Sequence, residues 1–159
     1  MDTQLIITVL LYVTATLLLA TKVFNIINKL AGKDLIILVL GIIALASHGE
    51  ILHQTIFLQA GFDFSFFNVI SIIGWFVALI VLFASLYYPI QQLLLILYPI
   101  AGVTILLEYF IPDVRILDQS LSMGLRIHIV LSICAYSLLM IGALQALLLA
   151  IQDKLIKTK

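Results

Sequence analysis

The chain has 159 residues, of which 64% are hydrophobic and only 10% are charged. Soluble domains carry about 25% charged residues, so this composition excludes an ordinary water-soluble domain. The net charge is zero, and nothing in the charge balance favours nucleic acid as a partner. The single cysteine, Cys134, lies in an apolar run and has no partner for an internal disulfide, so we expect it to be a small packing residue.

Five long apolar runs separated by short polar segments predict an all-α integral membrane protein, a bundle of five transmembrane helices. The first run has Asp2 rather than a basic segment before it and no small-residue cleavage site after it, so we interpret it as a retained span and not as a signal peptide. The expected spans cover residues of about 5–21, 35–57, 66–86, 92–110 and 125–151, within one transmembrane domain of residues 1–159.

The basic residues predict how these spans are oriented. If the chain alternates sides, one side collects six lysines and the other only two arginines: Lys22, Lys29, Lys33, Lys154, Lys157 and Lys159 against Arg115 and Arg126. Lysine and arginine accumulate in cytoplasmic segments close to the ends of spans. The sequence therefore predicts an N-terminus outside and a C-terminus in the cytoplasm.

The second span carries an unusual set of polar residues for membrane depth, namely His48, Glu50, His53 and Gln54. Ionisable side chains in hydrocarbon cost at least a few kcal/mol, so each one needs an explanation. On a helical wheel His48 points about 140–160° away from Glu50 and His53, which makes it the candidate for a site inside the bundle. A histidine hydrogen-bonded to a neighbouring helix is the alternative. His53 is expected at the outer interface.

The fifth span has Arg126 and His128 at its outer end. Below His128, one helical face consists of small residues, bordered by Tyr136: Ser132, Ala135, Gly142, Ala143 and Ala146. Two interpretations of this face stay open. Small residues allow helices to pack closely, and they also form a smooth apolar wall against which a flat ligand could lie beneath His128.

The third and fourth spans offer weaker signals. A stripe on the third predicts interhelical hydrogen bonds and packing: Asn68, Ser71, Trp75 and Ala78. Glu108, at the outer end of the fourth span, is expected in a solvated rim together with the loop residues Asp113, Arg115 and Asp118. A glycine-rich phosphate loop, a cysteine pair and a His-Glu-x-x-His helix are all absent, and the histidines are too scattered for structural zinc. The sequence thus predicts a protein that is not an enzyme.

The segment Leu125–Gln152, which reads LRIHIVLSICAYSLLMIGALQALLLAIQ, adds a resemblance. It is similar to the histidine-containing helix of the CcsA-type cytochrome c assembly family, in which a histidine near the outer surface precedes a Ser-x-x-x-Tyr stretch and small residues. Those positions are His128, Ser132 and Tyr136 here. LASHGEIL in the second span resembles that family's earlier helix with an intramembrane histidine, at the position of His48.

Other features make the YpjD-like inner-membrane branch the most similar. They are Asn68 in the third span, Tyr98-Pro99 in the fourth and the loop with Pro112. The resemblance covers essentially all of the chain, which looks like the first part of a roughly eight-span protein or a shortened member.

The resemblance implies a multi-pass protein of the bacterial inner (cytoplasmic) membrane that binds haem, and that passes or positions it for attachment to apocytochromes outside. By resemblance, His128 is the axial ligand of haem iron at an outer site and His48 the ligand at an internal site, and Ser132 and Tyr136 belong to the cofactor site. The implied partners are haem, membrane lipid and other cytochrome c assembly subunits or an apocytochrome.

Two other functions stay open. Trp75 is the only tryptophan and lies within a span, so the family's tryptophan-rich outer loop has no counterpart here. This absence favours a non-haem membrane subunit that scaffolds or regulates a partner such as an ion-transport protein. A small transporter with a polar path through Glu50, His48 and Asn68 is the third hypothesis, although five spans show no repeat of the kind transporters use.

Overall fold

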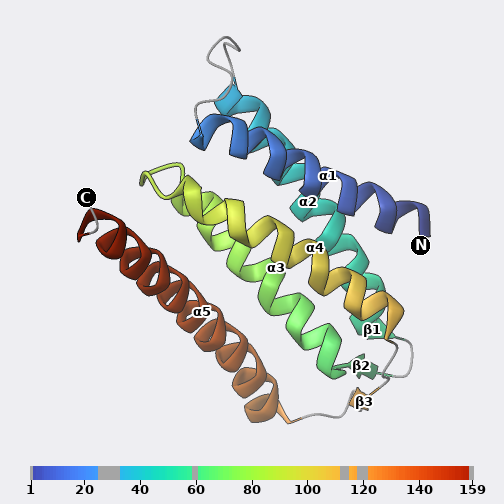
Figure 1. Ribbon diagram of the computed structural model, residues 1–159. Helices are drawn as coiled ribbons and strands as arrows, with labels where there is room; N and C mark the ends of the chain where they lie inside the picture. Colours follow the sequence, from blue (N-terminus) through green and yellow to red (C-terminus); the bar gives the residue numbers. More distant parts are fainter. Residues whose placement is uncertain (1, 25–32, 59–60, 112–114, 118–121, 158–159) are drawn as a thin grey trace.

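The computed structural model describes residues 2–24, 33–58, 61–111, 115–117 and 122–157. In these ranges the chain forms five α-helices, and a single 3-10 turn at Gln91–Leu93 leads into the fourth (Figure 1). All five are long and apolar enough to cross a membrane, which confirms the prediction of five helices. Their bounds are α1 Asp2–Val23, α2 Lys33–Ile56, α3 Phe66–Ala84, α4 Leu94–Phe110 and α5 Met123–Lys157.

The first four helices form a bundle, and α5 lies along one side of it (Figure 1). Helix α1 packs on α2 and α4, and α3 packs on α2, α4 and α5. The N-terminus and the C-terminus lie at opposite ends of the molecule, as an odd number of long antiparallel helices requires.

A small antiparallel sheet closes the end of the bundle at which α2 and α4 finish and α3 begins (Figure 1). We call this the sheet end. Its strands, in the order β1-β2-β3, are β1 Phe57–Leu58, β2 Gly61–Asp63 and β3 Ile116–Leu117. Gly61 has a φ of 148°, which a residue with a side chain rarely adopts. The sequence predicts the end of the second span at about Phe57 and then turns and loops, with no strand, because strands of two or three residues carry no alternating pattern.

Asp63 ties the sheet to the bundle. Its Oδ1 accepts the backbone N–H of Ser65 at 3.0 Å, just before α3, and that of Arg115 at 2.9 Å, just before β3. The side chain is only 6% exposed. One buried carboxylate thus joins β2 to the start of α3, two residues away, and to the residue before β3, 52 residues away.

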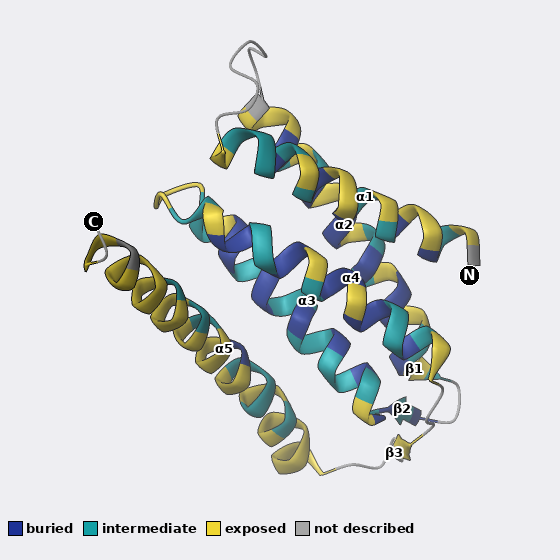
Figure 2. Cartoon of the chain, viewed as in Figure 1, coloured by how far each residue is buried: buried dark blue, intermediate teal, exposed yellow. Residues whose placement is uncertain are grey.

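Polar and apolar residues are unevenly distributed inside the bundle. All the buried polar residues in the described ranges lie in the sheet or in the helix halves nearest to it: Thr8, His48, Asp63, Ser65, Asn68, Ser71, Thr104, Glu108 and Ser137. Towards the opposite end the core is aliphatic, with Leu19, Val81, Leu82 and Leu94 among its members. Figure 2 shows this buried interior running along α1–α4. Buried histidine, carboxylate, serine and threonine side chains are therefore concentrated in the half of the bundle nearest to the sheet.

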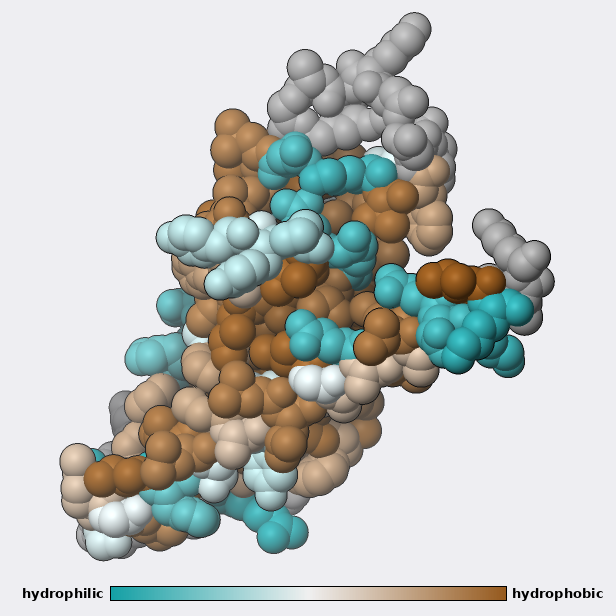
Figure 3. Space-filling view, turned by 90° about the vertical axis from the view of Figure 1, so that its left-hand side faces the viewer, coloured by the Kyte–Doolittle hydropathy of each residue, from teal (hydrophilic) through white to brown (hydrophobic). Residues whose placement is uncertain are grey.

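Helix α5 differs from the other four in burial. Only 6% of its most apolar stretch is buried, compared with 28% to 50% for the other helices. It is exposed along most of its length in Figure 2, and hydrophobic side chains cover much of the face of the molecule in Figure 3. Apolar surface on this scale needs lipid or protein around it.

Candidate functional site

His48 lies at the centre of the polar half of the bundle, where it is fully buried. Its Nδ1 is 3.0 Å from the hydroxyl of Tyr12 on α1, and its Nε2 is 3.0 Å from the hydroxyl of Ser71 on α3. The imidazole of α2 thereby links three helices, and both ring nitrogens have partners. The interhelical hydrogen-bond interpretation of His48 is confirmed.

The expectation that Glu108 belongs to a solvated rim is wrong. Its side chain is only 8% exposed, because α4 packs between α1 and α3 and turns this position inward. Its Oε1 accepts a hydrogen bond of 2.7 Å from the hydroxyl of Thr55 on α2. Ser71 on α3 is also near the carboxyl group. The loop residues Asp113 and Asp118 lie outside the described ranges.

The stripe on α3 makes the interhelical contacts expected of it. Besides the bond from Ser71 to His48, the indole N–H of Trp75 donates to the carbonyl of Leu45 on α2 at 2.7 Å. The amide of Asn68 donates to the backbone carbonyl of Asp63 at 3.2 Å. Ala78 is completely buried. The prediction of interhelical contacts is confirmed for Ser71, Trp75 and the packing residue Ala78, whereas Asn68 bonds to β2.

His128 occupies a different environment. It is exposed near the start of α5, and the Oγ of Ser132 donates to its backbone carbonyl at 2.8 Å. The residues with which α5 packs on the core, Ile141, Leu144 and Leu148, lie on the opposite side of the helical wheel from His128. The small-residue face with His128 therefore points away from the bundle. A Cβ added at Gly142 would meet nothing within 4 Å, and Tyr136 is 61% exposed.

The structure does not bring the two histidines together. His48 is enclosed by Tyr12 and Ser71, whereas His128 is on the outer face of a peripheral helix. The third histidine, His53, is exposed at the sheet end and stacks on Phe57 with 5.0 Å between the ring centroids. No group of three or more metal-ligating side chains occurs among the described residues.

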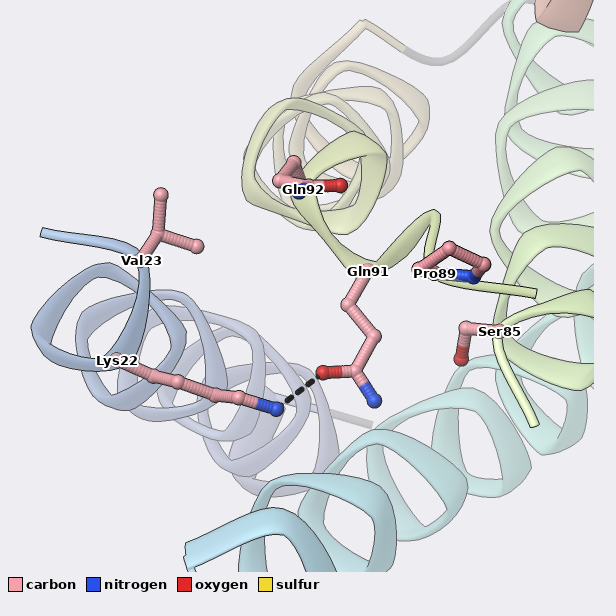
Figure 4. A pocket seen from close by; sticks show the side chains of 6 residues that line it. All are labelled: Lys22, Val23, Ser85, Pro89, Gln91 and Gln92. Carbon is pink, nitrogen blue, oxygen red and sulfur yellow. Dashed lines mark hydrogen bonds between the residues drawn. The ribbon is translucent and has the colours of Figure 1, made fainter. Parts of the chain in front are cut away.

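The surface has hollows at both ends. At the sheet end, a hollow of about 160 Å³ has three phenylalanines and Arg126 among its lining residues. Another, of about 250 Å³ and almost wholly apolar, opens between α1 and α4 beside Tyr12 and Tyr98. A third, of about 390 Å³, lies at the opposite end, where Lys22 donates to Gln91 beside Pro89 (Figure 4). Lys22 also pairs with Asp34.

Two features of the polar half of the bundle were not predicted from the sequence. Tyr12 was not singled out, because its role depends on which helix faces α1 and not on its own surroundings in the sequence. The inward position of Glu108 was missed because an acidic residue near the end of a span usually faces water.

No protein-family model, curated protein or solved structure matches this chain.

Proposed function

We propose that this chain is a haem-handling membrane protein of cytochrome c assembly, with His128 as its accessible axial ligand. The proposal rests on the resemblance of the fifth and second helices to that family. The observation that supports it best is an exposed imidazole on a face of α5 that is made of small residues and is free of packing within the described bundle. A histidine above an apolar wall suits a flat macrocycle whose iron takes imidazole as a ligand.

The residues around His128 fit one side of such a ligand. Ser132 and Ala135 lie one and two turns below it, within about 11 Å along the helix axis at 1.5 Å per residue, and Tyr136 borders the same face. Arg126, two residues before His128, lies about 160° away from it on the helical wheel and lines the hollow at the sheet end, so it belongs to the opposite side of α5. Haem, when bound, supplies the iron, and this chain holds and orients it.

Haem binding at His48 requires a larger change in the structure than haem binding at His128. Both of its ring nitrogens are engaged and the side chain has no exposed surface. Ligation there requires the bond to Tyr12 or the bond to Ser71 to break and the helices to separate. We therefore assign the first haem contact to His128 and keep His48 as the ligand of an opened state.

Absorption spectroscopy of the purified protein tests this function. Protein from haem-replete cells is expected to show a Soret band, which His128→Ala reduces strongly. His53→Ala is the matched control, because His53 is also an exposed histidine at the sheet end. Absence of the band in the wild-type protein, or equal loss in both variants, would contradict the proposal.

The exposure of α5 also favours the second candidate, a membrane subunit that scaffolds or regulates a partner. A helix with 6% of its most apolar stretch buried has a face free for another transmembrane helix, and its small residues suit close packing. This function predicts that Gly142→Leu abolishes association with the partner while His128→Ala leaves it intact.

A further inference from the structure

A carboxyl oxygen without a hydrogen-bond partner is buried in the polar half of the bundle. Oε1 of Glu108 accepts from Thr55, but Oε2 has no partner among the described residues. A charged carboxylate with an unsatisfied oxygen is one of the costliest groups to keep away from water. Something must neutralise it.

The neighbours of Glu108 define what that can be. The hydroxyls of Thr55 on α2 and Ser71 on α3 face it, and Asp63 of β2 is the acidic group nearby. Beyond Ser71, His48 and then Tyr12 of α1 continue the polar contacts. The loop before β3 approaches Asp63 through the backbone N–H of Arg115. No lysine is among the described groups that face the carboxyl.

A metal cation does not suit this environment. Calcium and magnesium take six or more oxygen ligands, whereas one oxygen of Glu108 is open and its neighbours are single hydroxyls. Oδ1 of Asp63 does not complete the set, since it already accepts two backbone N–H groups. A proton needs only one oxygen, and it removes the charge.

We propose that Glu108 is a buried proton-binding site that exchanges with water at the sheet end of the bundle only. Thr55 can form a hydrogen bond with both the ionised and the protonated carboxyl group of Glu108. When Glu108 is ionised, the Thr55 hydroxyl donates to Oε1. When Oε1 carries the proton, it donates to Thr55, whose hydroxyl turns to the carbonyl of Ile51, 3.1 Å away. One proton enters from water, the hydrogen bond between Thr55 and Glu108 reverses its direction, and no covalent bond other than the new O–H bond is made or broken.

The restriction to one end follows from the distribution of polar groups. Towards the sheet, Glu108 is close to the half-buried Thr55 and to the loop around Asp63. In the opposite direction the buried polar side chains end at Tyr12 and Tyr98. Beyond them the core of the bundle is aliphatic and includes Leu19, Val81 and Leu94. Protons thus reach Glu108 from one side and do not cross. The assignment of a proton-binding site to Glu108 does not depend on whether the protein binds haem.

Infrared difference spectroscopy of the detergent-solubilised protein between acid and alkaline buffer tests the site. We expect the C=O band of a protonated carboxyl group, lost in Glu108→Gln and shifted in frequency in Thr55→Val and Ser71→Ala. Glu50→Gln is the control and should leave the band in place, because Glu50 is an exposed carboxyl on α2 that accepts from Gln54. If Glu108→Gln fails to fold, the shifts in the Thr55 and Ser71 variants still decide.

Four results would overturn the proposal. The first is a band that persists in Glu108→Gln, and the second is a band that neither hydroxyl variant shifts. The third is a proton leak across vesicles containing the wild-type protein that Glu108→Gln abolishes, since this would show a through-path. A band that appears only without sodium or potassium would also count against it, because a monovalent cation would then be the occupant.

Discussion

The Tyr12 hydroxyl on α1 and Nδ1 of His48 on α2 lie 3.0 Å apart in the fully buried centre of the bundle, and the two rings meet edge to face. The pair connects helices whose contact positions are 36 residues apart in the chain. Water does not reach this pair, so a water molecule cannot take the place of either partner in the hydrogen bond.

Tyr12→Phe is expected to destabilise the folded bundle. Interhelical hydrogen bonds in membrane proteins contribute about 0.6 kcal/mol on average and up to about 1.7 kcal/mol. We expect a loss near the upper end because the substitution leaves a buried ring nitrogen without a partner. Unfolding of the protein in mixed detergent micelles measures it. Tyr136→Phe, at an exposed tyrosine of α5, should have no measurable effect.

Gly41→Ala should cost about 1–3 kcal/mol of stability through overpacking. A Cβ at this position would overlap the hydroxyl of Tyr98, a side chain with no exposed surface that cannot move aside freely. In a Tyr98→Phe background the same change should cost less, because the overlapping oxygen is gone. Gly142→Ala is the control and should be neutral, since its surroundings are open. Equal costs in both backgrounds would show that the overlap is not the cause.

Ala135→Phe tests the small-residue wall below His128. A large ring two turns from the histidine should obstruct a flat ligand and weaken haem binding at least tenfold without affecting the packed face of the helix. Leu147→Phe, at an exposed position about 100° away from His128 on the helical wheel and further along the helix, serves as the control. Unchanged affinity in Ala135→Phe would place the ligand elsewhere.

The orientation predicted from the lysines can be tested with single cysteines. In a Cys134→Ala background, a membrane-impermeant maleimide added to intact spheroplasts should label Thr3→Cys, and it should label Lys157→Cys only after the membrane is opened. Both positions lie near the ends of described helices, at opposite ends of the molecule. Labelling of both from outside would overturn the five-span topology.

The number and positions of the helices follow from the sequence because each apolar run is long enough to span a bilayer on its own. The partners of His48 do not follow in the same way. Nothing local to Tyr12 or Ser71 specifies which helix each faces, since that depends on how four helices pack together. The burial of Glu108 has the same origin. The sheet was not predicted because its strands of two or three residues are too short to show a pattern, and because the pairing of β2 with β3 joins segments that are far apart in the chain.

The role of His128 is tested most directly by titrating haem into protein prepared without it and following the Soret absorbance. We predict saturable haem binding by the wild-type protein, at least tenfold weaker haem binding by His128→Ala, and wild-type haem affinity in His53→Ala. Identical binding curves for the wild-type protein and His128→Ala, or no saturable binding at all, would contradict it.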